Sequence, residues 1–262
     1  MIDLSNETIV HVRKGPKEYL QFRKLLEYSD KISHCYTLKG DNNNYKEIEK
    51  DNYSILCKEL ELDYEYLTKV KNQAHSNVVE VVKDKQEIHE GIDGLITNKN
   101  RISLALVFAD CTPILFYDPV KNAIGNIHSG WRGTVQKIGQ IGAQKMLETY
   151  KCNKEDLLCF IGPCIRKCHF EVGEDVKDIF ENTFSYLLSP KNFIVKAEKK
   201  EDGQKYFIDT DIINRKLLEE IGIPNKNIIE SNICTVCNCN YMHSYRTEGN
   251  KSGRNTAIIG LK

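Results

Sequence analysis

Two histidines and one cysteine form a set that could bind a metal ion. His75, Cys111 and His128 each belong to a short polar segment beside an apolar run. Two imidazoles and a thiolate suit Zn²⁺, and three protein ligands leave a fourth position open for water or substrate, as in catalytic sites. The same ligands can form a trigonal copper site, so they leave the metal open. Their spacing is too wide for a compact finger motif, and a lone histidine or cysteine is more often packed or solvated.

The segment that contains His128 also has features of an anion site. Gly130 and Gly133 flank Trp131 and Arg132, directly before a run with helical periodicity. Glycines let the backbone approach a ligand, and the first N–H groups of a helix favour an anion. The planar guanidinium of Arg132 suits phosphate. The alternative is that Trp131 anchors the core and Arg132 forms a structural salt bridge.

Two more arginines, Arg246 and Arg254, precede the last apolar run. They either complete an anion pocket or are solvated loop charges, and the sequence does not separate these possibilities. The totals of Lys+Arg and Asp+Glu are both 37. Because the charges balance, we expect neither nucleic acid nor an anionic membrane as a partner, and an anion must be bound locally.

The chain contains ten cysteines. Its N-terminus has no basic flank or apolar run of an export signal, so we expect a cytoplasmic monomer with reduced thiols. Three cysteines lie close together near the C-terminus: Cys234, Cys237 and Cys239. They look like part of a second metal site, but a zinc site needs about four ligands, and the only addition nearby is His243. We interpret them as buried or incidental thiols, and Cys164 and Cys168 likewise.

Hydrophobic patterning predicts the elements that must position these residues. β-Branched and apolar runs predict strands at 77–82, 103–108, 114–117, 123–127, 157–161, 193–197 and 256–261. Helical periodicity predicts helices at 45–61, 133–150, 174–188 and 210–221. The polar segments therefore lie at strand ends, where they can converge at one rim of a sheet. The longest apolar stretch, 102–117, is interrupted by Asp110 and Pro113 and is shorter than the roughly 20 residues of a membrane-spanning helix.

The order of these elements indicates the fold class. Strands occur in groups instead of alternating one-for-one with helices, which favours an α+β layered sandwich with mixed sheets over a doubly wound parallel sheet. No linker, repeat or low-complexity tract marks a boundary, so we expect residues 1–262 to form a single domain.

Taken in order, the polar segments resemble the laccase-domain proteins. That family was long described as multicopper polyphenol oxidases and is now regarded as purine nucleoside phosphorylases with adenosine deaminase activity. The resemblance runs from about Ile32 to the end. The motifs that carry it are Gln73-Ala74-His75, Asp93-Gly94-Leu95-Ile96-Thr97, Ala109-Asp110-Cys111-Thr112-Pro113, His128-Ser129-Gly130-Trp131-Arg132-Gly133, Ile161-Gly162-Pro163-Cys164-Ile165, Phe170-Glu171-Val172-Gly173, Cys234-Thr235, and Ser244-Tyr245-Arg246 through Gly253-Arg254.

The resemblance implies a single α/β/β layered domain and places His75, Cys111 and His128 at the family's metal ligands. It also places Arg132 and Arg246 among the positive residues of the family's pocket. The chain departs from the family at three places. Ser76 stands where the family has a glycine after its first ligand histidine, Lys39 replaces the usual arginine, and the loop after Gly40 is shorter.

From the resemblance we predict a zinc-dependent purine nucleoside phosphorylase, with copper as the alternative metal. It would cleave adenosine, inosine or methylthioadenosine with phosphate to the free base and the sugar 1-phosphate, and would deaminate adenosine as a side activity. The predicted catalytic residues are Cys111, Asp110 and Arg132, with Asp110 as a proton shuttle. The predicted substrate and phosphate contacts are Lys39, Gln73, Arg132 and Arg246.

Three other functions compete with this prediction. A copper polyphenol oxidase needs a trinuclear cluster held by many imidazoles, and the chain has seven histidines in total. A cysteine hydrolase would use Cys111 as a nucleophile activated by His75 or His128. A metal-binding scaffold would keep the same residues without turnover.

Overall fold

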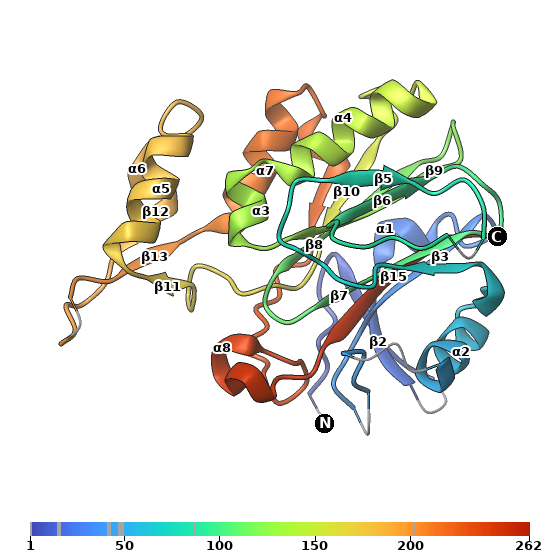
Figure 1. Cartoon of the computed structure of the whole chain (residues 1–262), viewed down its shortest axis with the longest axis horizontal. Helices are drawn as coiled ribbons and strands as arrows, with labels where there is room; N and C mark the ends of the chain where they lie inside the picture. Colours follow the sequence, from blue (N-terminus) through green and yellow to red (C-terminus); the bar gives the residue numbers. More distant parts are fainter. Residues whose placement is uncertain (1, 15–16, 41–42, 47–49, 86, 202) are drawn as a thin grey trace.

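The computed structural model describes residues 2–14, 17–40, 43–46, 50–85, 87–201 and 203–262. Two six-stranded sheets pack face to face, with several helices over the outer face of the second sheet and one helix on the outer face of the first (Figure 1). The first sheet has the order β1 (Ile9–Lys14), β2 (Lys17–Phe22), β3 (Ile32–Thr37), β15 (Asn255–Leu261), β7 (Ser103–Phe108) and β4 (Leu67–Lys69). The second has the order β14 (Ile228–Glu230), β10 (Leu158–Ile161), β8 (Thr112–Asp118), β9 (Ala123–Ser129), β6 (Gly94–Thr97) and β5 (Val79–Val81).

Both large sheets are mixed. The pairs β4·β7, β5·β6 and β10·β14 are parallel, and the remaining pairs are antiparallel. A third, three-stranded sheet contains β11 (Glu171–Val172), β13 (Tyr206–Ile208) and β12 (Ile194–Lys196). The prediction of an α+β layered sandwich with mixed sheets is confirmed.

The helices complete the layers. Over the second sheet lie α3 (Trp131–Val135), α4 (Ile138–Tyr150) and α7 (Thr210–Glu220) (Figure 1). The helix α2 (Lys50–Glu59) packs on the first sheet, and α5 (Glu174–Phe184) and α6 (Pro190–Phe193) pack beside the third. Short helical turns are α1 (Arg23–Leu26), α8 (Tyr245–Glu248), η1 (Tyr64–Tyr66), η2 (Asn225–Asn227) and η3 (Gly249–Lys251). Among the described residues, no helix has the length and apolarity needed to span a bilayer.

The second sheet lies between the first sheet and the helices, which explains why its central strands are buried on both faces. Every residue of β8 and β9 is buried. Along β8, Leu115 and Tyr117 face the core between the two sheets, whereas Ile114 and Phe116 face the core under α4. A strand covered on both faces reads as a continuous apolar run, and its period-2 alternation divides it between two cores.

The predicted elements match the structure with one major correction. The helix predicted at 133–150 is wrong as a single element, because the chain breaks into α3 and α4 at Lys137, whose φ of 61° is left-handed. The break lets Ile138 enter the core under α4, so packing overrides local periodicity. The helix predicted at 174–188 ends at Phe184. Of the predicted helix 45–61, residues 47–49 lie outside the described residues, and so do residues 41–42 of the shortened loop.

Candidate active site

Three chain segments bring His75, Cys111 and His128 together at one end of the facing sheets. His75 follows β4, Cys111 lies in the turn between β7 and β8, and His128 is on β9. One side-chain ligand atom from each residue lies within 4.8 Å of the others. The Cys111 Sγ is 4.0 Å from His75 Nε2, and the two imidazole centroids are 5.0 Å apart. The structure therefore assembles the predicted set without any of the three being neighbours in sequence.

A buried carboxylate orients two of the three residues. Asp93 Oδ1 lies 2.7 Å from His128 Nδ1, which leaves His128 Nε2 to face the cluster. Asp93 Oδ2 accepts hydrogen bonds from the backbone N–H of Ala74 and of Ser76, the latter at 2.7 Å. The Ser76 hydroxyl adds a third at 2.9 Å, so the departure from the family's glycine gives the His75 loop an extra contact. The sequence analysis included Asp93 in a motif but did not predict that it orients His128 and the loop of His75. The position of an acidic residue directly before a buried strand could have indicated such a role.

The backbone around the cluster is tightly constrained. His75 and Asp110 have φ angles of 55° and 79°, in the left-handed region that non-glycine residues rarely occupy. A Cβ added to Gly130 would lie 2.7 Å from His75 Cδ2 and 3.1 Å from Cys111 Sγ. Gly130 therefore lets the backbone pass directly behind both side chains, a requirement that sequence reasoning assigned to ligand approach instead.

The electrostatics of the cluster favour an ionised thiol. Burial alone would raise the pKa of the Cys111 thiol and lower that of the His128 imidazole. The attraction between these two groups outweighs burial, so the pKa of Cys111 is lowered and, with help from Asp93, that of His128 is raised. Burial also opposes ionisation of Asp93, but its bonds to His128 and Ser76 bring its pKa below the usual value. A thiolate is the form of cysteine that binds metals or acts as a nucleophile.

The cluster opens into a cavity of about 760 Å³, a size typical of small-molecule sites. The cavity is lined by more cations than carboxylates, although the whole chain is neutral. Its lining cations are Lys46, Lys69, Lys71, Arg132, Arg246 and Arg254. Its aromatic lining consists of Tyr45, Tyr53, Trp131, Phe170 and Tyr245. A positively charged pocket with flat apolar walls fits a ligand that is both anionic and aromatic.

Arg132 has the geometry of a ligand-binding cation. It is exposed and lines the cavity, its guanidinium carbon lies 4.2 Å from the centroid of the Trp131 ring, and no carboxylate pairs with it in the described part of the chain. The structural salt bridge considered as an alternative is therefore absent among these residues. Trp131 packs partly against the apolar cluster that contains Phe180. Because α3 has only five residues, the helix-dipole part of the anion prediction has little support.

Asp110 is held by three hydrogen bonds. Its Oδ1 accepts from the Thr235 hydroxyl at 2.6 Å, and its Oδ2 accepts from the Ser244 hydroxyl at 2.9 Å and from the Arg246 backbone N–H at 2.6 Å. The carboxylate therefore joins the turn that contains Cys111 to two segments near the C-terminus.

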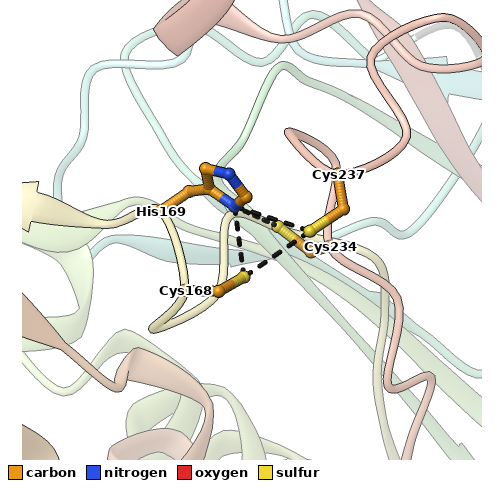
Figure 2. Close-up of side chains that lie close together, drawn as sticks. All are labelled: Cys168, His169, Cys234 and Cys237. Atoms are coloured by element: carbon orange, nitrogen blue, oxygen red, sulfur yellow. Dashed lines mark hydrogen bonds between the residues drawn. The ribbon is translucent and has the colours of Figure 1, made fainter.

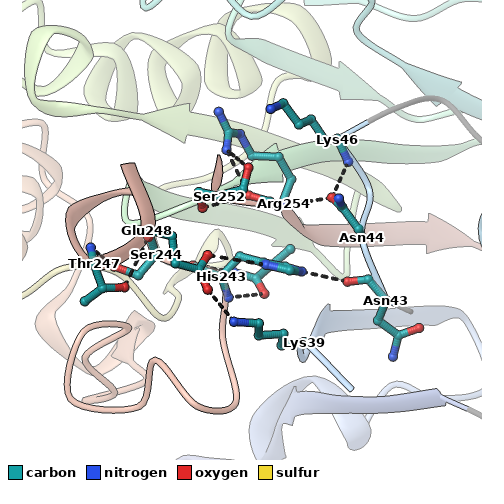
Figure 3. A network of polar contacts seen from close by, with 12 residues as sticks. Lys39, Asn43, Asn44, Lys46, His243, Ser244, Thr247, Glu248, Ser252 and Arg254 are labelled. Atoms are coloured by element: carbon teal, nitrogen blue, oxygen red, sulfur yellow. Dashed lines mark hydrogen bonds and ion pairs between the residues drawn. The ribbon is translucent and has the colours of Figure 1, made fainter. Parts of the chain in front are cut away.

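The predicted substrate contacts divide into two groups. Gln73 and Arg246 line the cavity, but both are also anchored to the backbone. The Gln73 amide exchanges two hydrogen bonds with the backbone of Val107, at 2.8 and 3.0 Å. Lys39 does not line the cavity and instead pairs with Glu248 (Figure 3). Sequence reasoning did not predict Lys69 or Lys71 at the cavity, because isolated lysines near strand ends carry no distinctive pattern.

The loop after Gly40 touches the cavity through its described part. Asn44 Oδ1 accepts from the backbone N–H of Arg254 at 2.9 Å, and the carbonyl of Asn43 accepts from His243 Nε2 at 2.9 Å (Figure 3). Arg254 in turn donates to the carbonyls of Ser252 and Gly253. These contacts place Arg254 beside the shortened loop, on the wall of the cavity.

Comparison with known proteins relates this chain to one family. The family described as multi-copper polyphenol oxidoreductase laccase matches residues 32–262. A purine nucleoside phosphorylase of Borreliella burgdorferi is 33% identical over 228 residues, which cover 87% of this chain and 90% of that protein. The purine nucleoside phosphorylase YlmD of Bacillus subtilis is 33% identical over 200 residues, covering 73% and 69% of the two chains. The crystal structure of the hypothetical protein YfiH of Bacillus licheniformis superposes with a TM-score of 0.82 at 26% identity, covering 96% of this chain and 99% of that one.

Proposed function

This chain belongs to the multi-copper polyphenol oxidoreductase laccase family, and from this premise we propose that it is a zinc-dependent purine nucleoside phosphorylase. The proposed substrates are adenosine and inosine, with methylthioadenosine as a further candidate. One observation carries the proposal: a single cavity contains the His75, Cys111 and His128 cluster, several aromatic side chains, and Arg132, which pairs with no carboxylate among the described residues. The relatives named purine nucleoside phosphorylase support the same activity.

The residues of the cluster fit a zinc ion. Two imidazoles and a thiolate with a lowered pKa match the ligand types of catalytic zinc sites. Asp93 behind His128 supplies the carboxylate that commonly orients a ligand histidine. His75, Cys111 and His128 would hold the ion, and when bound it supplies Lewis-acid chemistry at this end of the cavity.

In the proposed phosphorolysis, an oxygen of hydrogen phosphate bonds to the anomeric carbon of the ribose while the glycosidic bond to the purine breaks. The purine takes the electron pair of that bond, and the proton lost by hydrogen phosphate balances the proton that the base gains. Such a displacement passes through a transition state with oxocarbenium character. Arg132 binds and orients the phosphate, and the rings of Trp131 and Phe170 provide flat surfaces for the base. Catalysis by the chain's own residues then comes from proximity and orientation.

The proposed side reaction is deamination of adenosine, in which water replaces the amino group at C6 of the purine. Asp110 is the proposed proton carrier for this reaction. Its three hydrogen bonds hold the carboxylate in place and leave about one of its four lone-pair positions for a proton. We expect deamination, as the side reaction, to be slower than phosphorolysis.

The competing enzyme classes have less support from the geometry. A multicopper oxidase would need further imidazoles at the cavity, and only His75 and His128 line it among the described residues. The other five histidines have contacts elsewhere: His11, His34, His89, His169 and His243. A cysteine hydrolase using Cys111 would be alkylated by iodoacetamide whether or not zinc is present, whereas a zinc-bound thiolate is protected.

The proposal is tested by incubating zinc-loaded protein with adenosine or inosine, with and without phosphate, and separating bases from nucleosides by chromatography. We expect adenine or hypoxanthine to be released only when phosphate is present, and inosine to form slowly from adenosine. The Arg132→Met variant should raise the KM for phosphate more than tenfold, because loss of one charge-assisted contact costs about 1.5–3 kcal/mol. The matched control is Arg101→Met, since Arg101 pairs with Asp63 and does not line the cavity. Zinc-loaded protein that releases no base from either nucleoside would refute the proposed function.

A further inference from the structure

A second group of cysteine and histidine side chains lies outside the cavity. Cys168 and His169 come from the turn before β11, and Cys234 and Cys237 come from the loop after β14 (Figure 2). The expectation that His243 is the only further ligand for the C-terminal cysteines is therefore wrong. His243 Nε2 binds the carbonyl of Asn43, and two candidate ligands come from a distant part of the sequence.

The distances within this group are those of a tetrahedral zinc site. Zn–S bonds of about 2.3 Å and a Zn–N bond of about 2.0 Å, at tetrahedral angles, separate two sulfurs by about 3.8 Å and a sulfur from the nitrogen by about 3.5 Å. The Cys168 and Cys237 sulfurs are 3.7 Å apart. The His169 Nδ1 lies 3.2, 3.7 and 3.5 Å from the sulfurs of Cys168, Cys234 and Cys237, respectively. All four ligand atoms lie within 4.8 Å of one another.

Backbone contacts hold the two ligand segments together independently of the four side chains. A short parallel bridge joins them: the Cys164 N–H donates to the carbonyl of Ile233 at 3.3 Å, and the Thr235 N–H donates to the carbonyl of Cys164 at 3.0 Å. Arg166 Nη1 donates to Asn232 Oδ1 at 3.0 Å. The fold itself therefore places the ligands, as a preorganised metal site requires.

The turns themselves are also closed by local hydrogen bonds. The backbone N–H of Asn238 and its side-chain amide both donate to the carbonyl of Cys234, which closes the turn between Cys234 and Cys237. On the other segment, the His169 N–H donates to the carbonyl of Arg166 at 2.8 Å. Two cysteines separated by two residues on such a turn, facing two further ligands, are typical of structural zinc sites.

We propose that Cys168, His169, Cys234 and Cys237 form a second metal site, which binds Zn²⁺ as a closed, four-coordinate structural centre. Four protein ligands leave no position for substrate, so the site stabilises structure instead of catalysing a reaction. Binding displaces the protons of the three thiols into solvent, and the imidazole binds through its neutral Nδ1. Cys239 lies in the same loop but outside the group of four.

The second site would stabilise one wall of the cavity. Arg246 donates to the carbonyl of His169 at 2.9 Å and to that of Glu171 at 3.0 Å, so its guanidinium rests on the segment that begins with two of the zinc ligands. Phe170, between these carbonyls, lines the cavity. On the other ligand segment, Thr235 follows Cys234 and binds Asp110. The bound zinc is therefore a positioning element for Arg246, Phe170 and Asp110.

The first test is a count of zinc in protein purified without chelator and under reducing conditions. We expect two zinc ions per wild-type chain, one in the Cys168→Ser/Cys237→Ser double variant, and two in the matched control Cys239→Ser. The double variant should also melt at a lower temperature and show a higher KM with a smaller change in kcat. Equal zinc content in the double variant and the wild type would overturn the proposal, as would a Cys168–Cys237 disulfide in the wild-type protein purified in this way.

A second measurement covers the case in which the double variant does not fold. The Cys111→Ala variant removes a ligand of the cavity cluster but leaves the second group intact. Its remaining zinc should give an X-ray absorption spectrum that fits three sulfurs at about 2.3 Å and one nitrogen at about 2.0 Å. Absence of zinc from folded Cys111→Ala protein would contradict the second site. This readout does not depend on turnover, so it is separate from the test of the proposed phosphorylase.

Discussion

The two cysteine and histidine groups of this protein differ in the elements that carry them. His75, Cys111 and His128 come from segments at the ends of strands in the two large sheets, and they face a cavity. The second group, Cys168, His169, Cys234 and Cys237, comes from two turns that are joined by a short backbone bridge. Strand ends on a rigid sheet point side chains into a shared space, whereas paired turns enclose an ion.

The ligand counts of the two groups lead to different roles. Three ligands beside a cavity leave room for a substrate, and a buried carboxylate, Asp93, fixes the orientation of His128. Four ligands complete a tetrahedron and exclude substrate. We therefore expect the cavity cluster to control turnover and the second group to control stability and the position of one cavity wall. The following predictions test this division.

The largest expected effect separates the two groups by activity. Cys111→Ala should lower kcat/KM by about 1,000-fold or more, because the Lewis-acid contribution is several kcal/mol and each 1.4 kcal/mol is about tenfold. The Cys168→Ser/Cys237→Ser variant should keep a kcat within about tenfold of wild type while its melting temperature falls. Steady-state kinetics and thermal unfolding of both proteins provide the measurement. If the double variant loses kcat as completely as Cys111→Ala, the two groups do not have the proposed division of roles.

A smaller effect is expected from the carboxylate that supports only the cavity cluster. The two oxygens of the Asp93 carboxylate accept hydrogen bonds from Ala74, Ser76 and His128. In the Asp93→Asn variant the side chain is an amide, which can accept hydrogen bonds at only one of its two ends. Loss of such a partner weakens metal binding by about 10–100-fold. Competition with a zinc-binding dye should show one weakened site and one unchanged site per chain. Weakening of both sites together would mean that Asp93 acts through global stability.

These two groups also show what could be predicted from sequence. The layered fold, seven of the fifteen described strands and the cavity cluster were predictable, because central strands such as β8 are apolar on both faces and the polar segments interrupt them. Sequence patterns did not predict the break at Lys137 or the strands β1–β4, β6, β11, β13 and β14. Five of these strands have only two to four residues, and β1–β3 mix polar with apolar residues, so their patterns are weak. The break accompanies the packing of Ile138 in the core under α4.

The second group could not be predicted from local sequence. Cys168 and His169 are adjacent and resemble ordinary loop residues, and their partners lie in a loop more than sixty residues later. The bridge between Cys164 and Cys234 and the hydrogen bond from Arg166 to Asn232 bring the two loops together, and contacts of this kind leave no periodic signal in the sequence. Similarly, Gly130 could be recognised as a glycine near a ligand, but its contact with His75 and Cys111 required the folded chain.

The smallest expected effect concerns Arg246, the residue that joins the two regions. Arg246→Lys keeps the charge but loses the planar fork that donates to the carbonyls of His169 and Glu171. We expect the KM for phosphate to rise about tenfold, because hydrogen bonds from a charged donor are each worth about 1.5–3 kcal/mol and the site is partly exposed. Arg254→Lys is the matched control, since Arg254 lines the same cavity and donates to Ser252 and Gly253 instead.

A double-mutant cycle then measures whether the second group acts through Arg246. If zinc at the second group positions the carbonyl of His169, removing the zinc ligands already displaces the acceptor of Arg246. The Arg246→Lys change should therefore have a smaller effect in the Cys168→Ser/Cys237→Ser background than in the wild type, whereas Arg254→Lys should have the same effect in both. Additive effects of Arg246→Lys and the double substitution on KM would show that the two regions are energetically independent, so that the second group would stabilise the fold without positioning the cavity wall.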